Sequence, residues 1–562
     1  MTRLLISALL AGLLAPSALA QDSSQEDLLL DRLGHWADRA AHDLALTTGP
    51  APSRTVMAAV ELDFYQARAE LGSLLLESSH RRRPGRVEVV VGDDTLNSAR
   101  FQMVDPSLRV VARPSFVVED VALALDRDLW LTADHAYKSA VVQHQVKQAA
   151  LAALGGEPPP PDWSYAPATV AIDSSDLPAL DTDALRELTV QASARFRAVP
   201  ELRTGRVEAH GWTGHYYLAT SEGTRLQQPE GWVAIFAQAN LLRPDGVRVT
   251  DQRQWLVQTS GDLPPQAEIF AEVDAMAASL AARAKAEIVD DYEGPVVFEG
   301  RAAAELFRYL APRELCGTPP DPSAQQSYRQ LTRGGPRLGR RLMPAGWSIV
   351  DDPTQRFPGL PGGFDYDREG VAAERVELVS DGYVHDLLMS RVPRHDLARS
   401  NGHARGSVQG NWQARLSLWE VNPARNVSDR SFERSVARAM KASNQERILV
   451  VRGLGLGRLG DLPRPADAVW RYADGREEPV VSLQFQNVDR RALRDILAAG
   501  GGQQQYAYLA AWTLRSHADG DSGLPTVLTA PRRVLVGELE AVFPGADEKP
   551  HAYTMPGLGG GG

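Results

Sequence analysis

Stretches with helical periodicity and stretches with strand-like alternation follow one another along the chain. Leu29, Leu30, Leu33, Trp36 and Ala37 fall on one face of a helix predicted over residues 27–46. Further helices are predicted over residues 129–154, 181–199, 269–288 and 301–310, and Lys138 and Lys147 are expected on the polar side of the first of these. Strands are predicted at 86–92, 206–212, 216–219, 231–239, 295–299 and 533–543.

Breaks in these patterns predict the domain organisation. Gly155 to Pro161 is rich in glycine and proline, which predicts a linker. Gly294-Pro295 predicts a second interruption of the regular secondary structure. Beyond about residue 345 the chain is strand-rich. We therefore expect an α/β (α+β) fold, with a mixed α/β domain over residues 21–290 and a strand-rich domain over residues 291–550. The glycine-rich tail, residues 551–562, is expected to be disordered.

The first twenty residues have the pattern of a cleavable export signal. Arg3 gives a positive n-region, residues 4–14 are apolar or small, and Ala18-Leu19-Ala20 provides a cleavage site after Ala20. No later run of about 18 apolar residues follows, so the mature chain is expected to lack a membrane span. These features predict a periplasmic or secreted protein.

Charge and cysteine content narrow the class of protein. The 562-residue chain has a formal net charge of −11, which argues against a nucleic-acid partner. Arg81-Arg82-Arg83 is its strongest basic cluster and is expected in a solvated loop. The single cysteine, Cys316, excludes an internal disulfide and has no neighbouring histidine in sequence, so we expect a small, partly buried residue rather than a nucleophile.

The sequence contains no complete motif of a familiar catalytic site. No His-Glu-x-x-His sequence is present, and His385, His395 and His403 form the densest histidine group without helical spacing. The glycines between Gly453 and Gly460 follow an apolar strand, but no helix follows them to hold a pyrophosphate, so we expect a loop. Asp351-Asp352-Pro353 favours a turn.

Several motifs occur in a fixed order along the chain: Thr220 to Gly223, Gly294 to Leu310, Ser348 to Pro353, Gly363 to Val371, Val379 to Val384, Ser400 to Gly406 and Ile448 to Gly455. This order resembles the TldD/PmbA family of metallopeptidases and their metal-free partner subunits. A second set of segments, Val118 to Leu125, Arg127 to Leu131, Ala136 to Lys138 and Val146-Lys147, resembles an exported branch of the same family. The resemblance implies the fold of that family.

The zinc motif of the family is absent from this chain. Metal-bearing members bind zinc through His-Glu-x-x-x-His, whereas here Arg308, Tyr309 and Arg313 are placed at the His, Glu and His positions. A guanidinium cannot bind zinc, and no histidine lies between His215 and His385. The resemblance thus implies a chain without a cofactor of its own, in which zinc enters only with a metal-bearing partner subunit.

Three functions stay open from the sequence. The first is a non-catalytic, peptide-binding subunit, acting as a homodimer or as a heterodimer with a TldD-like metal-bearing paralogue. Its candidate peptide-binding residues are Asp365, Glu369, Asn401, His403 and Arg405; Asp365 and Glu369 are expected mainly to hold turns, while Arg405 could pair with a peptide carboxylate. The second is an active metallopeptidase with a non-standard site, for which His385, His395 and His403 are the candidate residues. The third is a stand-alone binding or scaffold protein.

Overall fold

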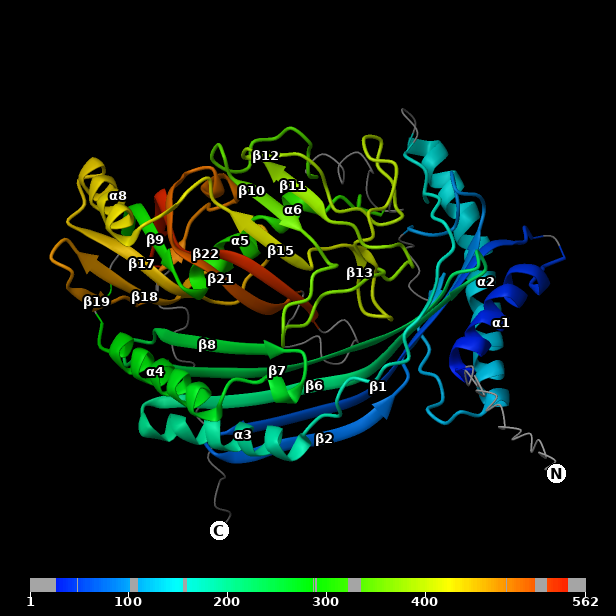
Figure 1. The fold of residues 1–562 in the computed structure, drawn as a ribbon, viewed down its shortest axis with the longest axis horizontal. Helices are drawn as coiled ribbons and strands as arrows, with labels where there is room; N and C mark the ends of the chain where they lie inside the picture. Colours follow the sequence, from blue (N-terminus) through cyan, green and yellow to red (C-terminus); the bar gives the residue numbers. More distant parts are fainter. Residues whose placement is uncertain are drawn as a thin grey trace, which may run out of the picture.

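Two twisted β-sheets face each other in the computed structural model, and helices cover the outer face of the first sheet (Figure 1). The structure describes residues 27–47, 49–101, 110–154, 159–286, 288, 291–321, 335–481, 483–510 and 523–543. The predicted export signal, the glycine-rich tail and most of the predicted linker lie outside these residues. The observed mixture of helices and strands confirms the predicted α/β class.

The first sheet is built around three very long antiparallel strands. Its order is β4-β3-β1-β6-β7-β5, with β2 added to β1 and β8 added to β7. The bounds are β1 Pro52–Glu70, β2 Ser73–Arg82, β3 Gly85–Val91, β4 Val111–Ala112, β5 Val170–Ile172, β6 Leu202–Thr220, β7 Arg225–Leu242 and β8 Arg248–Val257.

Alternation along β1 separates the two faces of this sheet. Met57, Ala59, Tyr65 and Ala67 pack into the cores beneath the helices. The intervening residues of β1, including Val56, Ala58 and Val60, point to the opposite face, where they meet the C-terminal half. Because successive side chains of a strand alternate between faces, one strand supplies both a helix-covered core and the wall of an interior space.

Four helices cover the outer face. They are α1 Leu28–Asp43, α2 Ala122–Leu154, α3 Thr182–Ala194 and α4 Gln266–Ala284. In Figure 1 the first two lie at one end of the sheet and the other two at its opposite end. The predicted placement of Lys147 on the polar side of α2 is wrong: its ammonium is fully buried, 2.7 Å from Asp162 Oδ2.

Two further predictions are wrong in this half. The segments 206–212 and 216–219 are not separate strands, because β6 runs unbroken through Thr213-Gly214-His215 and pairs with β1 on one side and β7 on the other. Arg83 is not solvated. Its guanidinium is buried and pairs with Glu61 at 2.9 Å and Asp120 at 2.8 Å.

The second sheet holds the C-terminal half. Its main order is β12-β11-β10-β15-β22-β9-β17-β18-β19, with β16, β20 and β21 attached. The bounds are β9 Asp291–Glu299, β10 Ser348–Asp351, β11 Val376–Ser380, β12 Tyr383–Val384, β15 Leu418–Asn422, β16 Asn426–Val427, β17 Arg447–Leu454, β18 Pro465–Tyr472, β19 Glu477–Pro479, β20 Gln484–Phe485, β21 Ile496–Ala510 and β22 Leu524–Val542. The small hairpin β13 (Ala404–Arg405) and β14 (Gln413–Ala414) stands apart from it.

Helices pack on both faces of this second sheet. Val296 and Phe298 of β9 contribute to the core that contains α5 (Arg301–Leu310), which is followed by α6 (Pro312–Leu315). Val297, between them, packs with Phe432 of α8 (Asp429–Ala442) on the other face. The apolar surface buried around α5 fixes this helix, so its side chains hold defined positions. Within the described part of the chain, no helix combines the length and the apolar character needed to cross a membrane.

Candidate functional site

Helix α5, which carries Arg308 and Tyr309, is held by a network of tyrosines and charges. Arg308 Nη1 donates to Tyr506 Oη at 3.2 Å, and its guanidinium lies 4.4 Å from the ring centroid of Tyr508. Glu305 Oε1 accepts the Tyr506 hydroxyl at 3.1 Å, and Oε2 accepts the backbone N–H of Leu454 at 2.7 Å. The side chains of Glu305 and Arg308 therefore have hydrogen-bond partners on β17 and β21.

Of the three residues placed at the motif positions, Arg308 and Tyr309 lie on α5, whereas Arg313 does not. Helix α5 ends at Leu310, and Pro312 starts the separate helix α6, which carries Arg313. The spacing His-Glu-x-x-x-His also fits Ala304, Glu305 and Tyr309, which all lie within α5. This register retains the glutamate, but Ala304 has no donor atom and the Tyr309 hydroxyl donates to Gly455 O at 3.0 Å.

The histidines singled out in the sequence do not assemble. Among the described residues, no group of three or more His, Cys, Asp or Glu side chains is arranged to hold a metal ion. His385 and His395 are exposed, whereas His403 is buried with Nε2 3.2 Å from Asp351 Oδ1. Cys316 is partly buried, and burial raises the pKa of its thiol to about 12, which opposes a nucleophilic role.

An interior space lies between the two sheets, and we call it the central chamber. It has a volume of about 900 Å³. Its aromatic lining comes from both halves of the chain: Phe64, Trp212 and Trp232 from the first sheet, and Phe364 and Tyr366 from the loop after β10. Gln66, Gln228, Arg356 and Asp365 add polar groups. A chamber of this size with apolar walls and a few polar groups is typical of a ligand site.

An ion pair between Arg368 and Glu230 connects the two halves of the chain across the chamber. Arg368, which follows β10, donates to both carboxylate oxygens of Glu230 on β7, at 2.5 and 2.7 Å. Its guanidinium also lies 4.1 Å from the ring centroid of Tyr216, whose hydroxyl donates to Arg368 O. At the solvent side, Asp365 pairs with Arg356 at 2.9 Å and is largely exposed.

The predicted peptide-binding residues fall into three places. Asp365 and Arg405 line the central chamber, although the Arg405 guanidinium is mostly buried and donates to Pro525 O at 2.6 Å. Glu369 lines a second cavity instead. Asn401 and His403 line neither: the Asn401 amide donates to Leu387 O at 2.9 Å and accepts the Met389 N–H at 2.7 Å, which holds the loop.

Asp367 and Glu369 form a buried acidic pair between the two spaces. Burial and the neighbouring Glu369 carboxylate raise the pKa of Asp367 to about 8, although three backbone N–H groups donate to it. Burial likewise raises the pKa of Glu369, against the opposing effect of the Arg391 N–H. A buried pair of this kind binds protons more readily than free carboxyls do.

Sequence reasoning missed the residues that the first sheet contributes. Phe64, Trp212 and Glu230 line the chamber because they occupy inward positions on β1, β6 and β7. Strand alternation could have placed them on one face. Nothing in the sequence, however, tells which face meets the C-terminal half.

Part of the chain matches a known protein family. Residues 292–534 match the family model described as PmbA/TldA metallopeptidase C-terminal domain. None of the curated proteins matches the chain.

Solved structures share the fold over nearly the whole chain. A Thermotoga maritima protein described as a candidate modulator of a DNA gyrase has a TM-score of 0.57 at 14% identity, with 87% of this chain and 96% of that chain covered. TldE from Thermococcus kodakarensis has a TM-score of 0.56 at 11% identity, with 92% and 100% covered. A Bacteroides thetaiotaomicron protein with a similar description has a TM-score of 0.55 at 11% identity, with 91% and 98% covered.

Proposed function

Because the chain belongs to the TldD/PmbA family, we propose that it is an exported, non-catalytic, peptide-binding subunit of a peptide-processing complex. Export rests on the signal-like residues 1–20. The observation that carries the proposal is the pairing of a large interior chamber with a metal-motif helix that has no histidine.

The chemistry of α5 supports a subunit that does not bind zinc. In either register the helix offers arginine, tyrosine or alanine where zinc would need imidazole. The Arg308 guanidinium stands beside Tyr506 and Tyr508 and keeps its positive charge, because the nearby tyrosines and Glu305 raise its pKa against the effect of burial. A fixed cation there repels a divalent ion.

The central chamber supports peptide binding. Its aromatic walls can bury apolar side chains, and its glutamines and backbone groups can hydrogen-bond to an extended main chain. Recognition through main-chain groups suits peptides of varied sequence. Hydrolysis would then be the task of an exported, metal-bearing paralogue that pairs with this chain.

The test uses peptides whose termini carry no charge. We expect a library of acetylated and amidated decapeptides to bind the purified chain by isothermal titration calorimetry. Trp212→Ala should weaken that binding about tenfold or more, because Trp212 lies on the chamber wall. The control Tyr383→Ala removes an exposed aromatic ring from the β11–β12 hairpin and should leave the affinity unchanged.

Two results would contradict the proposal. One is the absence of capped-peptide binding, and the other is equal binding by wild type and Trp212→Ala. Purification of the chain from its native host should also bring down an exported relative with an intact His-Glu-x-x-x-His motif. Recovery of this chain alone would contradict the proposed partner.

A further inference from the structure

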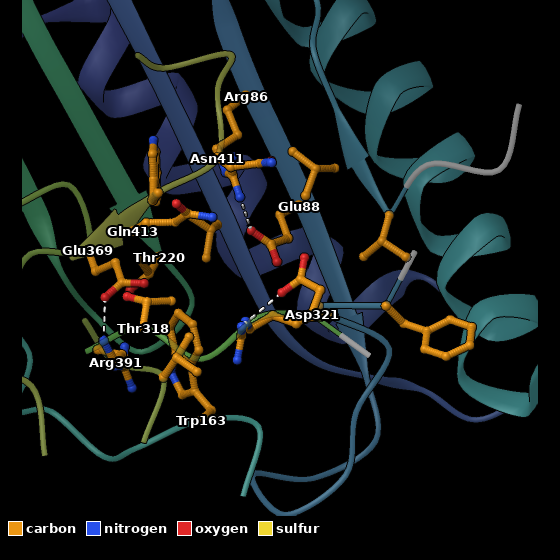
Figure 2. A pocket seen from close by; sticks show the side chains of 18 of the residues that line it. Arg86, Glu88, Trp163, Thr220, Thr318, Asp321, Glu369, Arg391, Asn411 and Gln413 are labelled. Carbon is orange, nitrogen blue, oxygen red and sulfur yellow. Dashed lines mark hydrogen bonds and ion pairs between the residues drawn. The ribbon is translucent and has the colours of Figure 1, made fainter. Parts of the chain in front are cut away.

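A second cavity, separate from the central chamber, lies between the inner face of the first sheet and loops of the C-terminal half (Figure 2). Its volume is about 420 Å³, within the range of small-ligand sites. Val56 and Leu218 line this cavity, whereas Val60 and Val408 of the same apolar cluster line the central chamber. We call this space the Glu88–Glu369 cavity, after the two carboxylates described next.

Two buried carboxylates face this cavity from different halves of the chain. Glu88 comes from β3 and Glu369 from the loop after β10, and each is 7% exposed. Figure 2 shows them on opposite sides of the space. Glu88 Oε2 accepts Arg86 Nη2 at 2.8 Å, and Glu369 Oε2 accepts the Arg391 N–H at 2.6 Å.

The second oxygen of each carboxylate is unused. Among the described residues, none donates a hydrogen bond to Glu88 Oε1 or Glu369 Oε1. Neither oxygen is among the fully buried atoms that lack a partner in the described residues, so both are open to a ligand in the cavity. An ammonium group carries three N–H donors and a positive charge, and it can donate to such an oxygen.

A cation occupies another part of the same wall. Arg100 lines the cavity with a backbone φ of 54°, a conformation that side chains other than glycine seldom adopt. Its Nη2 pairs with Asp321 Oδ1 at 2.8 Å, and within the described part of the chain its Nε and Nη1 have no partner. Strain of this kind persists where the surroundings impose it and is frequent at ligand sites. The open guanidinium edge suits a carboxylate.

We propose that the Glu88–Glu369 cavity binds a small zwitterion, a free amino acid or a short peptide with both termini charged. Glu88 and Glu369 provide the negative charge that attracts its α-ammonium, and Arg100 holds its α-carboxylate. A lone divalent cation fits less well, because no metal-binding group of three is present among the described residues and four arginines line the cavity. A simple anion would leave the two open carboxylate oxygens unsatisfied.

A ligand series on the wild-type protein tests this site. Alanine, Ala-Ala and Ala-Ala-Ala, titrated by calorimetry, distinguish a free amino acid from a short peptide as the favoured ligand. N-acetyl-Ala-Ala and Ala-Ala-amide each lack one terminal charge. We expect each capped form to bind about tenfold or more weakly than the free ligand, the loss typical of a charge-assisted hydrogen bond. Equal binding of free and capped forms, or no binding of any free form, would overturn the site.

Single substitutions show which of the two cavities binds the zwitterion. Glu369→Gln and Arg100→Gln, each checked for a native thermal transition, should weaken the best free ligand about tenfold or more. Glu88→Gln serves as a second carboxylate variant if Glu369→Gln fails to fold. Trp212→Ala in the central chamber should leave this affinity unchanged, and Glu369→Gln should leave the binding of capped decapeptides unchanged. A loss caused by Trp212→Ala and not by Glu369→Gln would move the zwitterion to the chamber and overturn this assignment.

Discussion

Several single residues in this protein bury a charged or ionisable group. Asp367 and Glu369 are the pair with the clearest consequence, because burial raises the pKa of both carboxyls. The folded protein therefore binds protons more tightly at this pair than the unfolded chain, whose carboxyls titrate near pH 4. The stability gained from these protons is complete below about pH 4 and is lost as the pH rises through about 8.

Glu369→Gln should remove much of this pH dependence. The variant loses one acid and relieves the repulsion on Asp367. Relative to wild type, its free energy of unfolding should therefore rise between pH 5 and pH 8, by roughly 1–3 kcal/mol. Urea denaturation at the two pH values measures this. Asp365→Asn, at an exposed carboxylate nearby, is the matched control and should show little change. A difference between wild type and Glu369→Gln that does not vary with pH would contradict the assignment.

Lys147 and Lys138 lie on the same helix, but their substitution should have very different effects on the free energy of unfolding. Lys147→Met leaves the Asp162 carboxylate buried without its cation, which should lower the free energy of unfolding by about 3–5 kcal/mol. Lys138→Met breaks only an exposed pair with Asp134 and should cost about 0.5 kcal/mol or less. Urea denaturation of the two variants side by side gives the comparison, and similar losses would show that Lys147 is not buried as described.

At the scale of elements, periodicity located the helices well and the strands less well. The helix 301–310 was predicted with its observed bounds, because a compact apolar pattern lies between Gly300 and Pro312. The strand β6 was split in the prediction, because Gly214 has weak strand propensity. Pairing on both sides overrides that propensity, since every backbone group there finds a partner.

The contact between α5 and β21 should contribute measurably to the free energy of unfolding. Tyr506→Phe removes the hydroxyl that donates to Glu305 Oε1 and accepts from Arg308 Nη1. Two charged groups lose a partner, so the free energy of unfolding should fall by about 1–3 kcal/mol. Tyr383→Phe, in a ring that is 47% exposed, should be nearly neutral. Thermal denaturation of both variants checks this, and a neutral Tyr506→Phe would mean that the network does not stabilise α5.

At the scale of the whole molecule, the candidate site exists only where the two halves meet. Asp365 and Arg405 could be named from motifs within the second half, and both line the chamber. Phe64 and Trp212 could not be named, because their role depends on packing between segments about 150 to 300 residues apart in sequence. Lys147 and Arg83 were misplaced for the same reason: their carboxylate partners lie outside their own elements.

The pair Arg368–Glu230 should hold the two halves together. A double-mutant cycle with Arg368→Gln and Glu230→Gln should give a coupling energy of about 1–3 kcal/mol, because the pair is bidentate and mostly buried. The same cycle on Arg356–Asp365, an exposed pair, should give less than about 0.5 kcal/mol. Equal coupling energies in the two cycles would show that Arg368–Glu230 contributes no more than a surface contact.

The central proposal is that this chain, whose residues 292–534 match the PmbA/TldA C-terminal domain, has no zinc site of its own. Its zinc content, measured by inductively coupled plasma mass spectrometry after equilibration with a small excess of zinc and gel filtration, tests that claim most directly. The account predicts a content far below one zinc ion per chain, because α5 offers no imidazole in either register. One tightly held zinc ion per chain would contradict it.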